Sequence, residues 1–283
     1  MGSRGGERWT RGVTRVLAPN PSAMSLDGTN TLIVAHEGFP EAIVVDPGPD
    51  DVQHLERVAS GRDIRLILLT HQHADHSEGA ARLSAMTGAP VRAFDAPLCI
   101  GAPPLRDGET IALGTPPIVV VSTPGHTGDS VCFHLPDDGA IGEDATGSML
   151  TGDTILGTGT TVIAEPDGSL AAYLRSLDAL RAFGRIPTLP AHGPLLPSLD
   201  DVAAAYIRHR LDRIRTVQDA IAGLGDHAMT DDELVRRLAD AVYPDLATGL
   251  ERAAHMMVRA HLAYLADPAN ARPVAGSSAG ACA

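Results

Sequence analysis

Lysine and aromatic residues are scarce in this chain of 283 residues. Lysine is absent, so all 22 basic residues are arginine. Aromatic side chains make up only 3% of the sequence, so the core must be built from Ala, Val, Leu and Ile. The formal charge is −13, which argues against a general nucleic-acid-binding surface because contacts with phosphates require a basic face.

Paired cysteines and long apolar runs are also missing. The three cysteines, Cys99, Cys132 and Cys282, form no CxxC pair, which favours a reducing compartment without a disulfide framework. Residues 1–15 contain no apolar stretch typical of a signal peptide, and no apolar run is long enough to span a membrane. We therefore expect a cytoplasmic protein that makes no membrane contact.

Short β-branched runs separated by Gly- and Pro-rich loops dominate the chain up to about residue 198, and helical periodicity dominates after it. The strongest predicted strands are 13–17, 29–34, 42–46, 64–69, 118–122 and 130–135. The predicted helices are 51–60, 77–86, 170–183, 200–224, 233–242 and 250–265. We predict one domain at 13–198, a small helical domain at 199–267, and disorder at 1–12 and 268–283.

Four candidate metal ligands lie directly after the apolar run 64–69. They are His71, His73, Asp75 and His76, at the point where a strand ends and a helix is expected to begin. A solvated surface loop rarely places so many ligand-type side chains at a strand end. Imidazoles with a carboxylate and no thiolate suit zinc or a similar divalent ion, and two ions fit this set better than one.

Further candidate ligands occupy the same kind of position elsewhere in the chain. Asp46, His126, Asp153 and His192 each close an apolar run on a loop that contains Gly or Pro. Because ligand sites in α/β folds collect at strand ends, we expect these side chains to converge with the 71–76 cluster.

Several motifs together resemble a known family. They are the 70–76 cluster, Thr123-Pro-Gly-His-Thr, Thr151-Gly-Asp-Thr-Ile-Leu-Gly, and Ile207-Arg-His-Arg followed by helical segments. The set resembles the metallo-β-lactamase superfamily of binuclear hydrolases. Within it, the chain is similar to lactamase-B-like hydrolases with a C-terminal winged-helix-like domain, a subgroup that includes a mitochondrial endoribonuclease. The resemblance implies an α/β fold, an αββα sandwich followed by a small helical domain.

The resemblance also implies roles for individual residues. The first metal would be held by His71, His73 and His126, and the second by Asp75, His76 and His192. Asp153 would bridge the two ions, which are expected to be zinc, with iron or manganese as alternatives. Asp46 would support the ligand loop, and the catalytic Asp75 would orient a metal-bound hydroxide.

Three functions remain open from the sequence. The favoured one is hydrolysis of a small or carrier-linked ester, thioester or amide. The alternatives are an endoribonuclease acting on single-stranded RNA and a di-iron redox module.

The predicted helical segment is not basic. From residue 199 onward the chain contains nine Arg and twelve Asp or Glu residues, a net charge of −3. We expect it to cap the active site or mediate a homodimer, with Arg208, His209 and Arg210 as candidate substrate-positioning groups. Cys132, Tyr173 and Ser176 are expected to pack in the interior rather than react.

Overall fold

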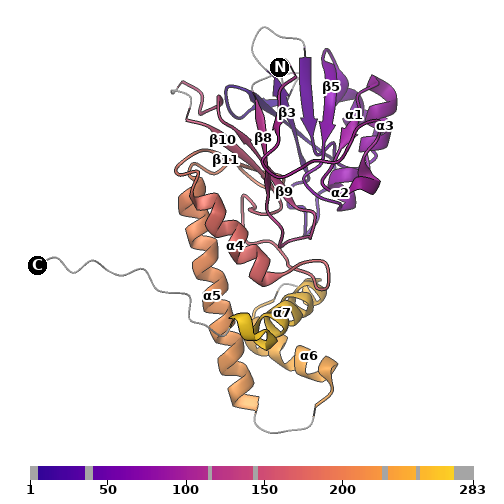
Figure 1. Cartoon of the computed structure of the whole chain (residues 1–283). Coiled ribbons are helices and arrows are strands. Elements are labelled where there is room, and N and C mark those ends of the chain that lie inside the picture. Colours follow the sequence, from indigo (N-terminus) through magenta and orange to yellow (C-terminus); the bar gives the residue numbers. More distant parts are fainter. Residues whose placement is uncertain are drawn as a thin grey trace, which may run out of the picture.

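The computed structural model describes residues 6–35, 41–113, 117–142, 146–224, 229–246 and 249–270. Residues 36–40, between two of the predicted strands, and Cys282 lie outside the described residues. The described chain folds into two mixed β-sheets, helices packed on both outer faces, and a helical extension at its C-terminal end (Figure 1).

The first sheet contains the N-terminal strands in sequence order, β1-β2-β3-β4-β5-β6. Their bounds are β1 Glu7–Arg8, β2 Val13–Leu17, β3 Asn30–Ala35, β4 Glu41–Val45, β5 Asp63–Leu68 and β6 Val91–Arg92. Strands β1 to β4 pair antiparallel, whereas β4, β5 and β6 run parallel. The parallel strands require crossover helices, which are α1 (Val52–Ala59) and α3 (Ala80–Thr87).

The second sheet has the order β11-β10-β9-β8-β7. Its strands are β7 Thr110–Ile111, β8 Ile118–Ser122, β9 Val131–Leu135, β10 Ser148–Gly152 and β11 Thr188–Pro190. Strands β10 and β11 run parallel, and helix α4 (Leu170–Arg181) connects them. Because β5, β8 and β10 end on the same side of the sandwich, the loops that follow them carry the predicted ligands to one edge.

Three apolar clusters hold these layers together. Val45 and Leu68 from the first sheet meet Phe133 from the second in the cluster between the sheets. A second cluster buries α1 and α3 against the first sheet, and a third buries α4 against the second sheet. Strand β4 illustrates the arrangement, because Ile43 and Val45 face the other sheet while Ala42 and Val44 face the helices. The predicted αββα sandwich is confirmed.

The C-terminal segment is helical, as predicted. It consists of α5 (Leu199–Leu224), α6 (Asp231–Val242), α7 (Glu251–Ala266) and the 3-10 turn η2 (Pro268–Asn270). Helix α5 packs beside α4 and continues beyond the sandwich, where α6 and α7 lie against it (Figure 1). Leu199 of α5 and Met257 of α7 belong to the same apolar cluster as α4, so packing is continuous across the predicted domain boundary. Among the described residues 199–270 there is no strand, and the winged-helix likeness stays a prediction.

One local prediction was wrong. The expected helix 77–86 is split into α2 (Ala74–Ser77) and α3 because Gly79 packs directly on the loop after β4. The Gly79 amide donates to the Gly48 carbonyl at 2.8 Å, and a Cβ at Gly79 would lie 2.9 Å from the Pro49 carbonyl oxygen. Parts of the terminal segments are described: β1 pairs with β2, and residues 268–270 form η2. No helix in the described part of the chain is both long and apolar enough to cross a bilayer.

Candidate metal centre

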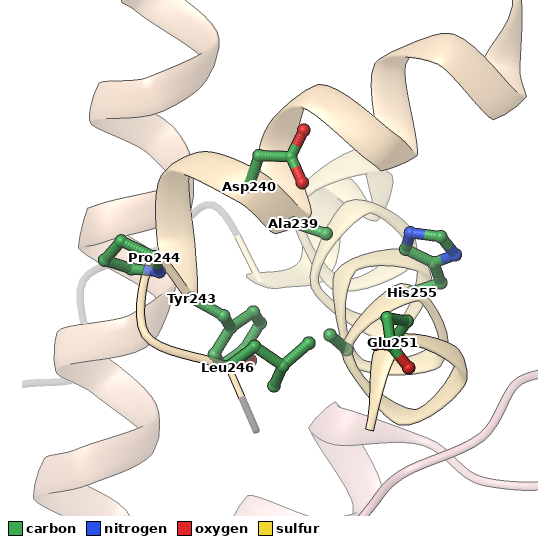
Figure 2. A pocket seen from close by; sticks show the side chains of 8 residues that line it. Ala239, Asp240, Tyr243, Pro244, Leu246, Glu251 and His255 are labelled. Carbon is green, nitrogen blue, oxygen red and sulfur yellow. The ribbon is translucent and has the colours of Figure 1, made fainter. Parts of the chain in front are cut away.

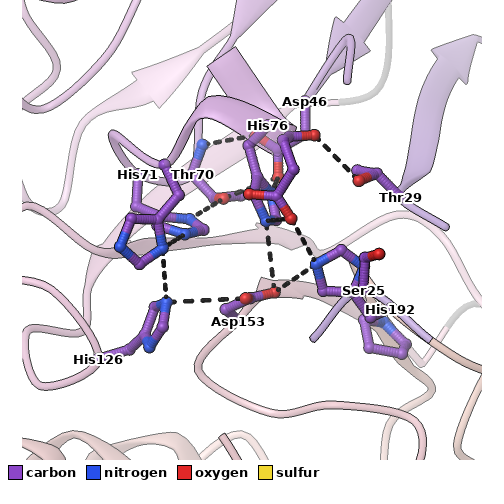
Figure 3. Close-up of polar contacts among 12 residues, drawn as sticks. Ser25, Thr29, Asp46, Thr70, His71, His76, His126, Asp153 and His192 are labelled. Atoms are coloured by element: carbon purple, nitrogen blue, oxygen red, sulfur yellow. Dashed lines mark hydrogen bonds and ion pairs between the residues drawn. The ribbon is translucent and has the colours of Figure 1, made fainter. Parts of the chain in front are cut away.

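The predicted ligands converge at one edge of the sandwich. His71, His73, Asp75 and His76 lie on the loop after β5 and on the short helix α2. His126 follows β8, Asp153 follows β10, and His192 follows β11. Figure 3 shows Asp153 between His126 on one side and His192 on the other, with His76 facing it. We call these residues the His/Asp edge, defined as His71, His73, Asp75, His76, His126, Asp153 and His192.

The first group of ligand atoms is made of imidazole nitrogens. His73 Nδ1 lies 3.0 Å from His71 Nε2 and 3.0 Å from His126 Nε2. These three side chains form one cluster whose ligand atoms lie within 4.8 Å of one another. Three nitrogens of neutral imidazoles cannot all satisfy each other by hydrogen bonding, so the cluster is suited to a shared cation.

The second group mixes imidazoles with a carboxylate. Asp75 Oδ2 lies 3.3 Å from His192 Nε2 and 3.6 Å from His76 Nε2. Both imidazoles are buried, whereas the Asp75 side chain retains 37% of its exposure. Asp75 is therefore the ligand of this group that faces the solvent side of the site.

Asp153 lies between the two groups. Its Oδ2 is 3.6 Å from His126 Nε2, while its Oδ1 is 3.6 Å from His76 Nε2 and 3.5 Å from His192 Nε2. Gly152 precedes Asp153 and adopts a φ of +51°, which glycine tolerates. It also packs closely against Thr70, where a Cβ would lie 2.6 Å from Thr70 Oγ1, so a larger residue before Asp153 would be disfavoured. Each carboxylate oxygen thus faces a different group, as a bridging ligand requires.

Unpartnered buried atoms indicate that the edge fits metal ions. His76 Nε2, His192 Nε2 and Asp153 Oδ1 are buried and have no hydrogen-bond partner. Such atoms are costly unless a ligand satisfies them. The distances of 3.0 to 3.6 Å across both groups also fit a tetrahedral zinc site, in which neighbouring nitrogen ligands lie about 3.3 Å apart. The His/Asp clusters therefore support a site for two metal ions.

Asp46, directly after β4, contacts the edge from behind, which fits the supporting role that the family resemblance implies for it. Its Oδ2 accepts from Thr70 Oγ1 at 2.7 Å and lies 2.9 Å from His76 Nδ1, while its Oδ1 accepts from the Thr70 amide at 2.8 Å. Thr70 Oγ1 in turn lies 3.0 Å from His71 Nδ1. Asp46 adopts a φ of +51°, which Asp tolerates better than most residues. One buried carboxylate thus orients an imidazole of each group.

Two other imidazoles are oriented by backbone carbonyls. His126 Nδ1 lies 2.6 Å from the Val162 carbonyl oxygen, and His192 Nδ1 lies 3.1 Å from that of Gly28. When Nδ1 carries the proton and donates it to the carbonyl, Nε2 is left as the ligand atom. In both residues that free nitrogen faces the other ligands.

The loop that carries Val162 is anchored by the helical extension, which the sequence analysis missed. Tyr206 Oη of α5 donates to the Gly159 carbonyl at 2.8 Å and accepts from the Leu156 amide at 3.1 Å. Arg210 of α5 donates to the Thr161 carbonyl, and Met257 Sδ of α7 accepts from the Ile163 amide at 3.1 Å. Helices α5 and α7 therefore hold the loop that orients His126.

Electrostatics divide the imidazoles into two classes. Burial lowers the pKa of His71 well below its usual value and also lowers that of His126, so both stay neutral, as ligands must be. Burial also acts to lower the pKa of His76, but the carboxylates of Asp153 and Asp46 outweigh it and raise this pKa well above its usual value. Burial opposes the charge of Asp153 too, yet neighbouring His76 holds that pKa well below its usual range. The carboxylates of Asp153 and Asp46 therefore favour a positive charge beside them, either on a protonated imidazole or on a metal ion.

The three predicted substrate-positioning residues separate in the structure. His209 and Arg210 line a cavity that also includes His126 and Asp153, whereas Arg208 is exposed on α5 and does not line it. Arg210 is only 2% exposed, and its Nε has no hydrogen-bond partner. The interior predictions also hold: Cys132 and Tyr173 are fully buried, burial raises the pKa of the Cys132 thiol to about 11, and Ser176 donates to the Pro124 carbonyl.

Comparison with known proteins gives the class. The model of the metallo-beta-lactamase superfamily matches residues 24–192, a span that includes every residue of the His/Asp edge. The chain belongs to this superfamily. Its fold and its paired clusters fit the binuclear class that the motifs predict.

Individual relatives refine this class. The chain is 33% identical over 214 residues to lactamase-like protein nscB of Aspergillus fumigatus, which covers 74% of this chain and 61% of that protein. It is 30% identical over 260 residues to an atrochrysone carboxyl ACP thioesterase of Aspergillus chevalieri, which covers 85% of this chain and 77% of that protein. The chain spans roughly 60 to 66% of the length of several of the curated relatives that it matches.

A solved structure supports the fold alone. A beta-lactamase domain protein from Burkholderia ambifaria has a TM-score of 0.73 to this chain at 20% sequence identity. The match covers 93% of this chain and 89% of that one, so the likeness includes the helical extension.

Proposed function

We propose that this chain is a binuclear metal-dependent hydrolase that cleaves carrier-linked or small thioesters. The observation that carries the proposal is the position of Asp153, whose two oxygens face two separate clusters of imidazole and carboxylate ligands. His71, His73 and His126 would hold the first ion, and Asp75, His76 and His192 the second. Zinc suits this donor set, and iron or manganese are the alternatives.

Two divalent ions held there would supply a nucleophilic water of lowered pKa and polarise the scissile carbonyl. The side chains supply the rest of the mechanism. Asp75, the most exposed member of its group, would orient the attacking water and accept its proton. Asp153 would fix the separation of the two halves of the site, while Asp46 and the Val162 carbonyl keep the ligating nitrogens aimed inward.

A thioester fits better than a phosphodiester. The ACP thioesterase of Aspergillus chevalieri is among the relatives, which supports an acyl substrate delivered on a carrier. For an endoribonuclease, a basic groove would be needed. Several exposed arginines around the helical extension are instead paired with carboxylates, as in Arg181–Asp200, Arg185–Asp201 and Arg259–Asp232.

The test is a thioesterase assay on metal-loaded protein with an isosteric variant. Acyl-pantetheine thioesters should release free thiol, and Asp153→Asn should lower kcat/KM by at least about 100-fold because the bridging charge is lost. Asp178→Asn, which removes an exposed carboxylate on α4, is the matched control and should leave the rate unchanged. Cleavage of single-stranded RNA that Asp153→Asn abolishes, without any thioesterase activity, would replace the proposal with the nuclease.

A further inference from the structure

A cavity of about 300 Å³ connects the His/Asp edge with the helical extension. Asp153 and His126 form part of its wall at the metal-binding end. The remaining wall comes from three parts of the chain: residues 23–26, the loop 156–162, and the helical extension, which contributes residues of α5, of α7 and of the turn between α6 and α7. Tyr243, Leu246 and Leu250 come from that turn, and Ala253, Ala254 and Met257 from α7. Apolar side chains dominate the helical part of this wall, which favours an apolar ligand.

We propose that this cavity binds the acyl group of the substrate and that Leu246 and Tyr243 limit the length of that group. The inference rests on the proposed thioesterase function. A thioester whose carbonyl lies at Asp153 must direct one of its two sides into the cavity. The thiol side of a carrier-linked substrate continues to a protein and must remain outside. The acyl side is therefore the one that enters.

The length limit follows from a second cavity behind the first. It has a volume of about 240 Å³ and lies between α6 and α7, lined by Ala239, Asp240, Tyr243, Pro244, Leu246, Glu251, Ala254 and His255. Tyr243, Leu246 and Ala254 line both cavities and so separate them. Figure 2 shows the Tyr243 ring and the Leu246 side chain next to each other, with Glu251 and His255 across the second cavity.

Two of the three residues of the partition, Tyr243 and Leu246, differ in how firmly they are held. The guanidinium of Arg213 lies 5.2 Å from the centre of the Tyr243 ring and donates to the Val242 carbonyl at 2.9 Å, which fixes the ring. Leu246 follows α6 and presents only an aliphatic side chain. Shortening Leu246 should therefore connect the cavities while Tyr243 stays in place. Longer acyl groups would then extend into the second cavity.

The binding test uses S-alkyl pantetheine thioethers, which cannot be hydrolysed, with butyl, octyl and dodecyl chains. Isothermal titration should show that the wild-type protein gains affinity from butyl to octyl but not from octyl to dodecyl. Leu246→Ala should improve dodecyl binding relative to octyl by about tenfold or more, because each newly buried methylene is worth about fourfold. Leu262→Ala, a truncation in the α6–α7 core that borders neither cavity, is the matched control.

A second variant tests the opposite direction. Ala253 lines the first cavity on α7, and Ala253→Leu should narrow the cavity without disfavouring the helix, so octyl binding should fall relative to butyl. Thermal melts establish that each variant is folded. The inference is overturned if neither variant shifts the ratio between chain lengths, or if Leu262→Ala shifts it as much as Leu246→Ala does. Length-dependent binding without hydrolysis of the matching thioesters would instead contradict the proposed function and leave the cavity assignment standing.

Discussion

At the His/Asp edge, each ligand follows the end of a strand, and four of the imidazoles are oriented by Asp46, by Thr70 or by a backbone carbonyl. In the helical wall of the cavity, the contacts come from helices that are far from the edge in sequence and contribute mainly apolar side chains. Asp46 orients His76 within the first sheet and its loops. Tyr206 instead reaches across from α5 to the loop 156–163. The contacts at the edge therefore fix the geometry of the ligands, whereas the helical wall would, under the proposed function, accommodate acyl groups of different length.

The largest effect should come from disturbing the support behind the edge. Asp46→Asn keeps the shape of the side chain but removes the negative charge that accepts from Thr70 and faces His76. We expect metal affinity to fall about 10- to 100-fold, as for other residues that orient metal ligands. Competition with a chromogenic chelator measures this directly. An affinity equal to that of the Asp178→Asn control would show that Asp46 does not act through the ligands.

A smaller effect should come from the contact that links the two regions. Tyr206→Phe removes the hydroxyl that bonds to Gly159 and Leu156, which should cost about 1 to 2 kcal/mol of unfolding free energy in chemical denaturation. Because the same loop holds the carbonyl that orients His126, metal affinity should also fall, by up to about tenfold.

Tyr264→Phe makes the same change on α7, where the ring packs against the apolar cluster of α4, and is the matched control for Tyr206→Phe. It should leave metal affinity unchanged. If Tyr206→Phe lowered stability and left metal affinity at the wild-type level, the helices would support the fold but not the edge.

The smallest effect concerns pH and the helical extension alone. Burial lowers the pKa of His261 on α7 to about 4. The pKa of this imidazole is near 6.5 in the unfolded chain. Between that value and the folded value, the unfolded chain binds more protons than the folded chain, so the free energy of unfolding falls as the pH falls through this window. His261→Leu should reduce this dependence by up to about 1.4 kcal/mol per pH unit. Urea denaturation of both proteins at pH 7 and at pH 5 measures it, and identical slopes would exclude His261 as the source.

The edge could be predicted from the sequence because its signal is local. Ligand-type side chains recur where apolar runs end, and strand ends in such folds meet at one edge. Asp46 was found for the same reason. Its partners are a strand-end residue and a member of the 71–76 cluster.

The helical wall could not be predicted in this way. Met257 of this wall and the neighbouring Tyr206 are separated by long stretches of chain from the loop 156–163 that they contact, and their apolar or aromatic side chains are typical of any core. One signal was available within α5: Tyr206, Arg210, Ile214 and Val217 follow helical spacing and share its buried face. That spacing separates Arg210 from exposed Arg208. It does not reveal what Arg210 contacts, because Thr161 lies in a loop with no periodicity.

The most direct test of the central claim is the number of metal ions bound per chain. Protein loaded with zinc and freed of excess metal should contain two ions per chain by mass spectrometry of the metal, and Asp153→Asn should contain fewer, because its bridging oxygens face both clusters. Asp178→Asn should again match the wild type. A wild-type chain that retains one ion or none, or an Asp153→Asn variant that retains two with undiminished affinity, would contradict the binuclear site.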